Sequence, residues 1–202
     1  MNSSPRRKPL WRWEAFLFGL VLLLAIVAGS IVRAGWGLIG ALVVGALLVV
    51  AVAAAALLIV PLVRPGGRDS ENTLRSVEGV ELVPLTSGEA EQRTVRVLQS
   101  ERRQTAIEAA RAKSAGEPRG VLTPDASVWL GRRLQVAVDL VSDGGTVYRV
   151  GFVPPELEAD LERLLRPLAE RGAAALVPVR IVGESRPFRV EILLPPQMDT
   201  SA

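Results

Sequence analysis

Residues 34–63 form a run of 30 residues without a single charged side chain. A helix rises about 1.5 Å per residue, so about 20 apolar residues cross the hydrocarbon core of a bilayer. A second uncharged run, of 18 residues, precedes it at 15–32. Backbone polar groups in lipid must bond within their own segment, which favours helices. The sequence therefore predicts two transmembrane helices.

The short connection between the two runs predicts an antiparallel hairpin. Residues 33–37 read RAGWG and supply one charge, an interfacial aromatic and two glycines. Basic residues flank the pair of runs, as they do on the cytoplasmic side of membrane proteins. They are Arg6, Arg7, Lys8 and Arg12 before the first run and Arg64, Arg68 and Arg75 after the second. We expect a basic tail at 1–13 and a hairpin at 14–63, with helices near 15–32 and 36–63 and both termini cytoplasmic.

Four further features of the apolar runs bear on their role. Trp11 and Trp13 would mark the interface away from the turn. A signal peptide cleaved before Ser30 is the alternative for the first run, but the second run directly after it favours an anchor. The small residues Gly37, Ala41 and Gly45 lie four apart, and we expect them to pack within the hairpin. Neither run holds an ionisable residue, so no ion pathway is predicted.

Composition excludes several kinds of chemistry. The chain has no Cys and no His, which excludes disulfides, thiolate nucleophiles, Cys/His zinc sites and histidine bases. Arginine outnumbers lysine 22 to 2, which is typical of a GC-rich bacterial genome, so the expected location is a bacterial plasma membrane. From residue 64 onward 19 basic side chains accompany 20 acidic ones. This near-neutral part does not indicate a broad phosphate-binding surface.

After the hairpin we expect a linker at 64–78, a domain at 79–196 and a short tail at 197–202. Residues 80–85, VELVPL, predict a first strand. Thr86 and Glu89 have the spacing of a capping box, so a long helix is predicted over 89–114. Residues 116–125, GEPRGVLTPD, combine Gly and Pro and predict a loop.

The second half of the domain alternates between strand and helix patterns. Strands are predicted at 133–141 and 146–153, joined by a type I′ turn at Asp143-Gly144. A helix is predicted over 156–172, ending at Gly172, with an apolar stripe of Leu157, Leu161, Leu164, Leu165 and Leu168. Two more strands follow at 175–182 and 187–194. The predicted class is α+β, with two β-hairpins, a long first helix and a second helix packed on the sheet, or a partly open barrel.

One stretch of this domain resembles a known family. Val150, Gly151, Phe152 and Pro154, followed by Arg180, Ile181 and Gly183, are similar to the back half of HIRAN domains. The resemblance covers residues 134–194. It implies an OB-like barrel and an association with DNA ends and single strands. From the residues alone, Gly151 could instead allow a close backbone approach, with Phe152 in the core and Pro154 ending a strand.

Two functions follow as hypotheses. The first is a non-enzymatic module, anchored in the lipid bilayer and needing no cofactor or metal, that presents its domain to a protein partner. The second is a membrane-tethered, HIRAN-like protein that binds nucleic acid. The candidate binding surface comprises Trp129, Arg132, Arg133, Tyr148, Arg149 and Arg180. A carboxylate enzyme ranks last, because Glu156, Glu158 and Asp160 suit the first turns of a helix.

Overall fold

The computed structural model of the chain describes residues 6–10, 13–63, 72–74, 76–85, 92–116, 118–128 and 131–196. Several residues named above lie outside these ranges: Trp11, Arg12, Arg64, Arg68, Arg75, Thr86, Glu89, Trp129 and the tail 197–202. The chain divides into two compact units. The helical unit consists of Arg7–Gly66 and Val128–Arg132, and the sheet unit of Met1–Arg6, Gly67–Ser127 and Arg133–Ala202.

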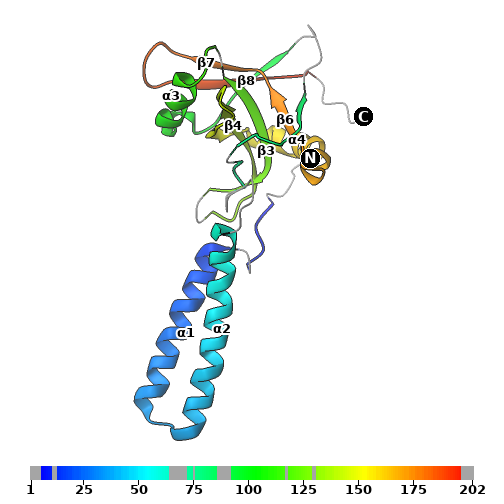
Figure 1. Cartoon of the computed structure of the whole chain (residues 1–202). Helices are drawn as coiled ribbons and strands as arrows, with labels where there is room; N and C mark the ends of the chain where they lie inside the picture. The colour runs from blue at the N-terminus through cyan, green and yellow to red at the C-terminus, as the bar shows by residue number, and fades with distance from the viewer. Residues whose placement is uncertain are drawn as a thin grey trace. The chain divides into compact units, whose positions relative to one another are not determined.

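The helical unit contains the predicted hairpin. Helices α1 (Glu14–Ala34) and α2 (Gly37–Val63) run side by side in opposite directions (Figure 1). Gly35 ends α1 in the left-handed region, at φ 66°, and its N–H bonds the carbonyl of Val32. Glycine adopts this conformation at little cost, which is why the turn falls here. Both helices are long and apolar enough to cross a membrane.

The two helices pack through a narrow seam. Its buried or half-buried residues recur every three or four positions: Leu17, Leu20, Val21, Leu24, Ala28 and Ile31 on α1, and Gly40, Val44, Leu47, Ala51, Ala54, Ala55 and Leu58 on α2. The expectation that Gly37, Ala41 and Gly45 pack within the hairpin is wrong, because all three are exposed. Gly40 is the buried glycine, and an added Cβ there would lie 3.4 Å from Ile31 Cγ2.

The sheet unit holds two β-sheets and two longer helices. Its strands are β1 (Leu82–Pro84), β2 (Arg93–Arg96), β3 (Arg119–Ala126), β4 (Gln135–Val141), β5 (Val147–Phe152), β6 (Ala174–Val177), β7 (Val179–Val182) and β8 (Arg189–Leu194). The five-stranded sheet has the order β1-β6-β3-β4-β5 and the three-stranded sheet β2-β8-β7. Only the β1–β6 pair is parallel. The short helix η2 (Ser100–Arg102) leads into α3 (Gln104–Ala112), and α4 (Pro155–Glu170) follows β5.

The two sheets are joined at both sides by continuous backbone. Pro178 alone separates β6 from β7, so the chain passes directly from one sheet into the other. On the opposite side, Val97 N–H bonds Val190 O at 2.9 Å. Leu98 then exchanges two bonds of 2.8 and 3.1 Å with Phe152 at the edge of β5. The paired strands therefore close on themselves around one core.

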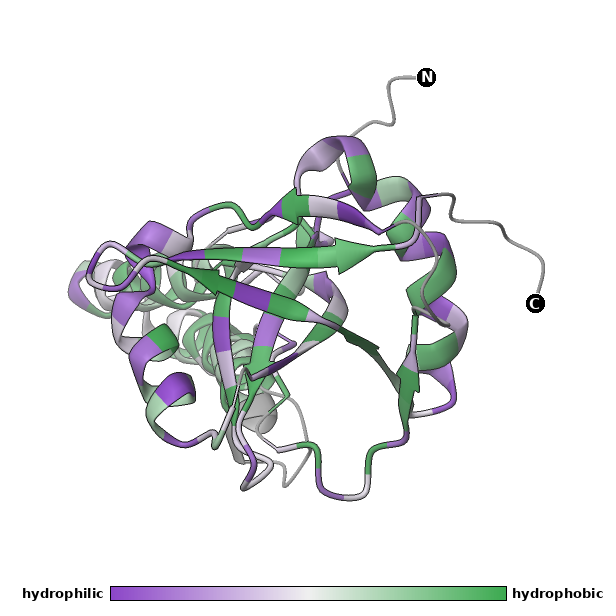
Figure 2. Cartoon of the chain, turned by 90° about the horizontal axis from the view of Figure 1, so that it is seen from above, coloured by the Kyte–Doolittle hydropathy of each residue, from purple (hydrophilic) through white to green (hydrophobic). Residues whose placement is uncertain are grey.

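The core is filled from both sheets and both helices. The buried side of α4 carries Leu157, Leu161, Leu165 and Leu168, and α3 adds Ile107 and Ala110. Each buried leucine contributes about 1.5–3 kcal/mol of transfer free energy. The helices lie at opposite sides of the sheets (Figure 1), and α4 shows apolar and polar faces (Figure 2). A second cluster of buried apolar residues contains Leu74. The sheet unit therefore includes part of the segment 64–78, which was expected to be a linker.

Much of the predicted element order is confirmed. The structure has the strand near 80–85, the β4–β5 hairpin, the helix that ends before Gly172, and the last strands. The turn type is wrong, since positive φ falls on Gly145 and not on Asp143-Gly144. Ser142 N–H bonds Thr146 O at 3.0 Å, which makes the connection one residue longer than a type I′ turn.

Two segments were predicted wrongly. Within the expected helix 89–114, residues 93–96 form β2, and the helix α3 covers only Gln104–Ala112. Thr94 and Val95 are β-branched and favour a strand, and pairing with β8 completes it. The expected loop 116–125 is mostly β3, a central strand. Its Pro124 falls where the pairing with β4 shifts, between Thr123 and Ala126, so no ladder hydrogen bond is lost.

Candidate functional site

A groove of about 640 Å³ runs along the outer side of α4 in the sheet unit. Its walls are charged and its floor is largely apolar. The lining residues are Arg6, Arg133, Leu134, Pro155, Glu158, Ala159, Glu162, Arg163, Arg166, Pro167 and Glu170. A second pocket lies among the apolar helices of the helical unit.

The sequence of α4 explains why charges gather on this side. Pro155 occupies the first turn, where its missing N–H has no helical partner to lose. The leucine stripe faces the core. Glu158, Glu162 and Arg166 are spaced four apart and so share another face. The groove is therefore a consequence of the amphipathic pattern of the helix.

Ion pairs of both signs line the groove. Arg133 Nη2 lies 3.0 Å from Glu158 Oε2, and Gln135 donates to Glu158 Oε1 at 3.3 Å. Arg166 bonds Glu162 at 2.9 Å. Both glutamate side chains are less than a fifth exposed, whereas both arginines are more than two fifths exposed. The carboxylates therefore form fixed acceptors, and the guanidinium groups have room to move.

Arg6 also lines the groove, although it lies far from α4 in the sequence. Its side chain pairs with Glu162 and lies 3.0 Å from Asp125. Its carbonyl accepts the N–H of Leu134 at 2.9 Å. Arg6 precedes α1 in the sequence, so the sheet unit includes residues from both sides of the helical hairpin.

The predicted binding residues that the structure describes are distributed over both units. Trp129 lies outside the described residues, and Arg132 belongs to the helical unit. Arg133 lines the groove. Arg180 is exposed on β7, opposite Glu191 of β8. Within the sheet unit, Arg133 and Arg180 therefore lie on different elements.

Tyr148 and Arg149 are neighbours on β5 and point to opposite faces of the sheet. Tyr148 is half-buried, with the Lys113 ammonium 5.6 Å from its ring centre. Arg149 is only 7% exposed and bonds Asp139 through Nε at 2.8 Å and Nη2 at 3.3 Å. Thr123 donates to the same carboxylate at 2.9 Å. The placement of Arg149 on a binding surface is therefore wrong: it balances a buried charge within the sheet.

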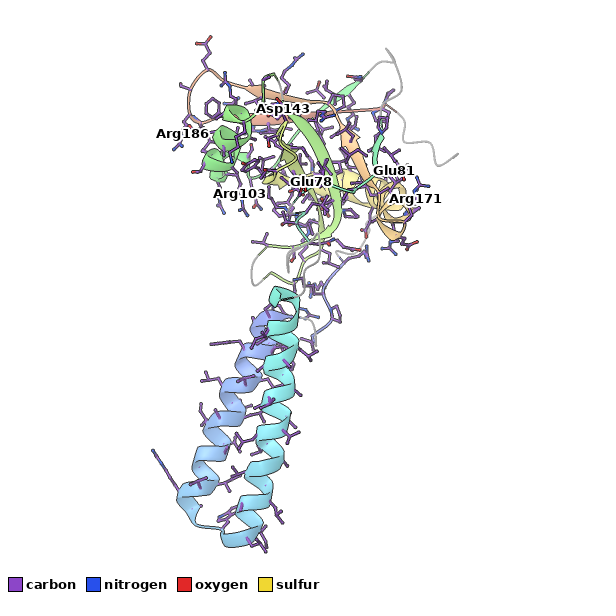
Figure 3. All side chains as sticks on the ribbon, viewed as in Figure 1. Glu78, Glu81, Arg103, Asp143, Arg171 and Arg186 are labelled. Atoms are coloured by element: carbon purple, nitrogen blue, oxygen red, sulfur yellow. The ribbon has the colours of Figure 1, made fainter. Side chains whose placement is uncertain are left out.

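The titratable groups with shifted pKa values lie away from the groove. Arg186 bonds Glu108 on α3, and this contact lowers the pKa of Glu108 and raises that of Arg186. A backbone hydrogen bond, followed by the contact with Arg96, lowers the pKa of Glu101. Arg186 and Arg103 project on the side that carries α3, and Arg171 on the side of α4 (Figure 3). These exposed pairs are ordinary surface ion pairs.

The described residues hold no group of three acidic side chains that could bind a metal ion. A comparison with family models, with curated proteins and with solved structures finds no match to the chain. Sequence reasoning missed Arg6, Glu162 and Leu134 as groove residues. The i,i+4 charges of α4 were a visible signal, but Arg6 was interpreted only as a charge that orients the hairpin.

Proposed function

We propose that this chain is a membrane-anchored interaction module that binds a protein partner through the α4 groove. The observation that carries the proposal is the combination of paired charges over an apolar floor. Leu134, Ala159 and Pro167 offer apolar contact, while Glu158 and Glu162 offer acceptors. Protein interfaces combine an apolar centre with a polar rim in this way.

The charge balance of the groove favours a peptide over a polyanion. Four arginines and three glutamates line it. A phosphate backbone that approached the arginines would also meet Glu158, Glu162 and Glu170, and like charges at close range cost binding energy. A peptide that carries both signs could instead replace the internal ion pairs with new ones.

The anchor is the helical hairpin, with both ends on the cytoplasmic side of a bacterial plasma membrane. Two spans return the chain to the side on which it started. The pairing of Arg6 with Asp125 and Leu134 supports this arrangement, because residues before and after the hairpin belong to one folded unit. The basic residues at both ends of the hairpin agree with the cytoplasmic side.

Nucleic-acid binding on an OB-like or HIRAN-like barrel is the second candidate. The closure of the strands through Leu98 and Phe152 favours a barrel of this general kind. The candidate phosphate contacts weaken it, because Arg149 is buried and Arg133 is paired with Glu158. Steep salt dependence of binding would distinguish it from the first proposal.

The test places a photocrosslinking amino acid at Ala159, on the groove floor, in the full-length protein in native membranes. We expect one discrete protein adduct that is lost in R133E, since the reversed charge would face Glu158. The matched control is R180E, which alters an exposed arginine outside the groove and should leave the adduct unchanged. A nuclease-sensitive adduct would support the second candidate, and equal adducts in both variants would contradict the groove proposal.

A further inference from the structure

The connection between β3 and β4 contributes an arginine to the start of α1. The segment Val128–Arg132 belongs to the helical unit. Lys8 N–H donates to Arg132 O at 2.7 Å, and Arg132 Nε donates back to Lys8 O at 3.0 Å. These reciprocal bonds fix both the backbone and the side chain of Arg132.

The guanidinium of Arg132 also stacks on an aromatic ring. Its centre lies 5.6 Å from the ring of Trp13, the residue that precedes α1. Arginine has five N–H donors in one plane, and only Nε is used on Lys8. Within the described ranges no acceptor is recorded for its two terminal nitrogens. The fork of a guanidinium group can bind two phosphate oxygens at once.

The charges around Arg132 favour an anion. Lys8 is half-buried and bonds Glu14 through Nζ at 2.9 Å, and Arg7, which precedes it in the sequence, is exposed. Three cations and one carboxylate leave an excess of positive charge. Since Glu14 begins a helix of 21 residues that is otherwise largely apolar, these groups would lie at headgroup depth in a bilayer.

We propose that Arg132, with Lys8 and Arg7, binds the phosphate of an anionic phospholipid headgroup, while Trp13 holds the guanidinium in place. The proposal rests on the insertion of the hairpin into a membrane, as proposed above. A phosphodiester accepts two parallel hydrogen bonds from one arginine. The bound lipid would tie the β3–β4 connection to the membrane surface.

The test uses the full-length protein reconstituted in nanodiscs of phosphatidylcholine, with phosphatidylglycerol added in steps. We expect phosphatidylglycerol to raise the thermal unfolding temperature of the wild type and of the control R180Q. In R132Q the apparent affinity for phosphatidylglycerol should fall about fivefold, which is the contribution of one cation near an anionic membrane surface. R132K keeps the charge but loses the planar fork, so its apparent affinity for phosphatidylglycerol should lie between those of the wild type and R132Q.

Three outcomes would overturn the proposal. The first is an unchanged response to phosphatidylglycerol in R132Q. The second is an unfolding temperature of the wild type that is the same in phosphatidylcholine alone and after phosphatidylglycerol is added. The third is equal stabilisation by inorganic phosphate, which would assign the site to a free anion. Failure of the wild type to enter any nanodisc would instead contradict the membrane anchor itself, so the two failures are distinguishable.

Discussion

At the scale of single residues, Gly151 shows how one position permits the closure of the sheets. A Cβ added there would lie 2.2 Å from the carbonyl oxygen of Leu98, which is part of the backbone. Leu98 could move only by losing its two bonds to Phe152. The structure thus confirms the close-approach interpretation of Gly151 made from the sequence.

We therefore expect G151A to lower the free energy of unfolding by about 1–3 kcal/mol, the usual cost of overpacking. Chemical denaturation in mild detergent, followed by circular dichroism, measures it. The control is G144A in the β4–β5 turn, where an added Cβ meets nothing within 4 Å. Equal stability of G151A and the wild type would show that the sheets do not close through Leu98.

The buried pair of Arg149 and Asp139 gives a second prediction. R149M leaves the Asp139 carboxylate buried with only Thr123 as a donor. Removing one partner of a buried pair costs about 3–5 kcal/mol. The double variant D139L/R149M should recover much of that loss, since no unpaired charge remains. A change in the free energy of unfolding of less than about 0.5 kcal/mol in R149M would contradict the burial of Arg149.

Acid should weaken one surface contact of α3. The pKa of Glu108 is lowered in the folded state by Arg186, so the pair stabilises the fold above the ordinary glutamate pKa. This contribution is lost as the pH falls through the lowered value. The small difference in unfolding temperature between the wild type and E108Q should therefore be present at pH 7 and absent at a pH well below that lowered value. A difference that persists in such acid would contradict the pairing.

At the scale of elements, the sequence predicts the long helices from their apolar patterns. It misses a strand that depends on pairing with distant segments. The uncharged length of the two apolar runs and the periodic leucine stripe of α4 are both strong signals, so these helices could be predicted. β3 could not, because Gly120 and Pro124 at its ends are typical of a loop. An added Cβ at Gly120 would lie 2.3 Å from Val179 Cγ2. That glycine is required by a crossing strand far away in the sequence, which no local pattern reveals.

The α4 stripe supplies a prediction at this scale. Leu161 is 1% exposed, and L161D would place an unpaired charge in the core. We expect loss of the cooperative thermal transition of the sheet unit, measured by circular dichroism in detergent. The control R163D changes an exposed position two residues away and should melt like the wild type. A folded L161D would contradict the observed face of α4.

The candidate site was predictable only in part, for the same reason. Arg133 was selected from the sequence and does line the groove. Its partner Glu158 was assigned to the helix dipole, and Arg6 to the orientation of the hairpin. Both assignments consider each charged residue only together with its neighbours in the sequence. Bringing Arg6 onto Glu162 requires the complete fold, because α1 and α2 lie between them in the sequence.

At the scale of the whole molecule, the chain combines an apolar hairpin with a sheet unit assembled from both of its flanks. In the proposed topology, the two helices supply the even number of membrane crossings that such an assembly requires between Arg6 and the residues from Asn72 onward. We therefore propose that the N-terminus and the sheet unit lie on one side of a membrane, with the turn on the other.

The chain has no cysteine, so single cysteines can be introduced at Asn2, Trp36 and Gly144 without other changes. Labelling with a membrane-impermeant maleimide in sealed vesicles of known orientation measures which side each one faces. We expect N2C and G144C to react from the cytoplasmic side and W36C only from the other. Reaction of N2C and G144C from opposite sides, or of all three from one side, would contradict it.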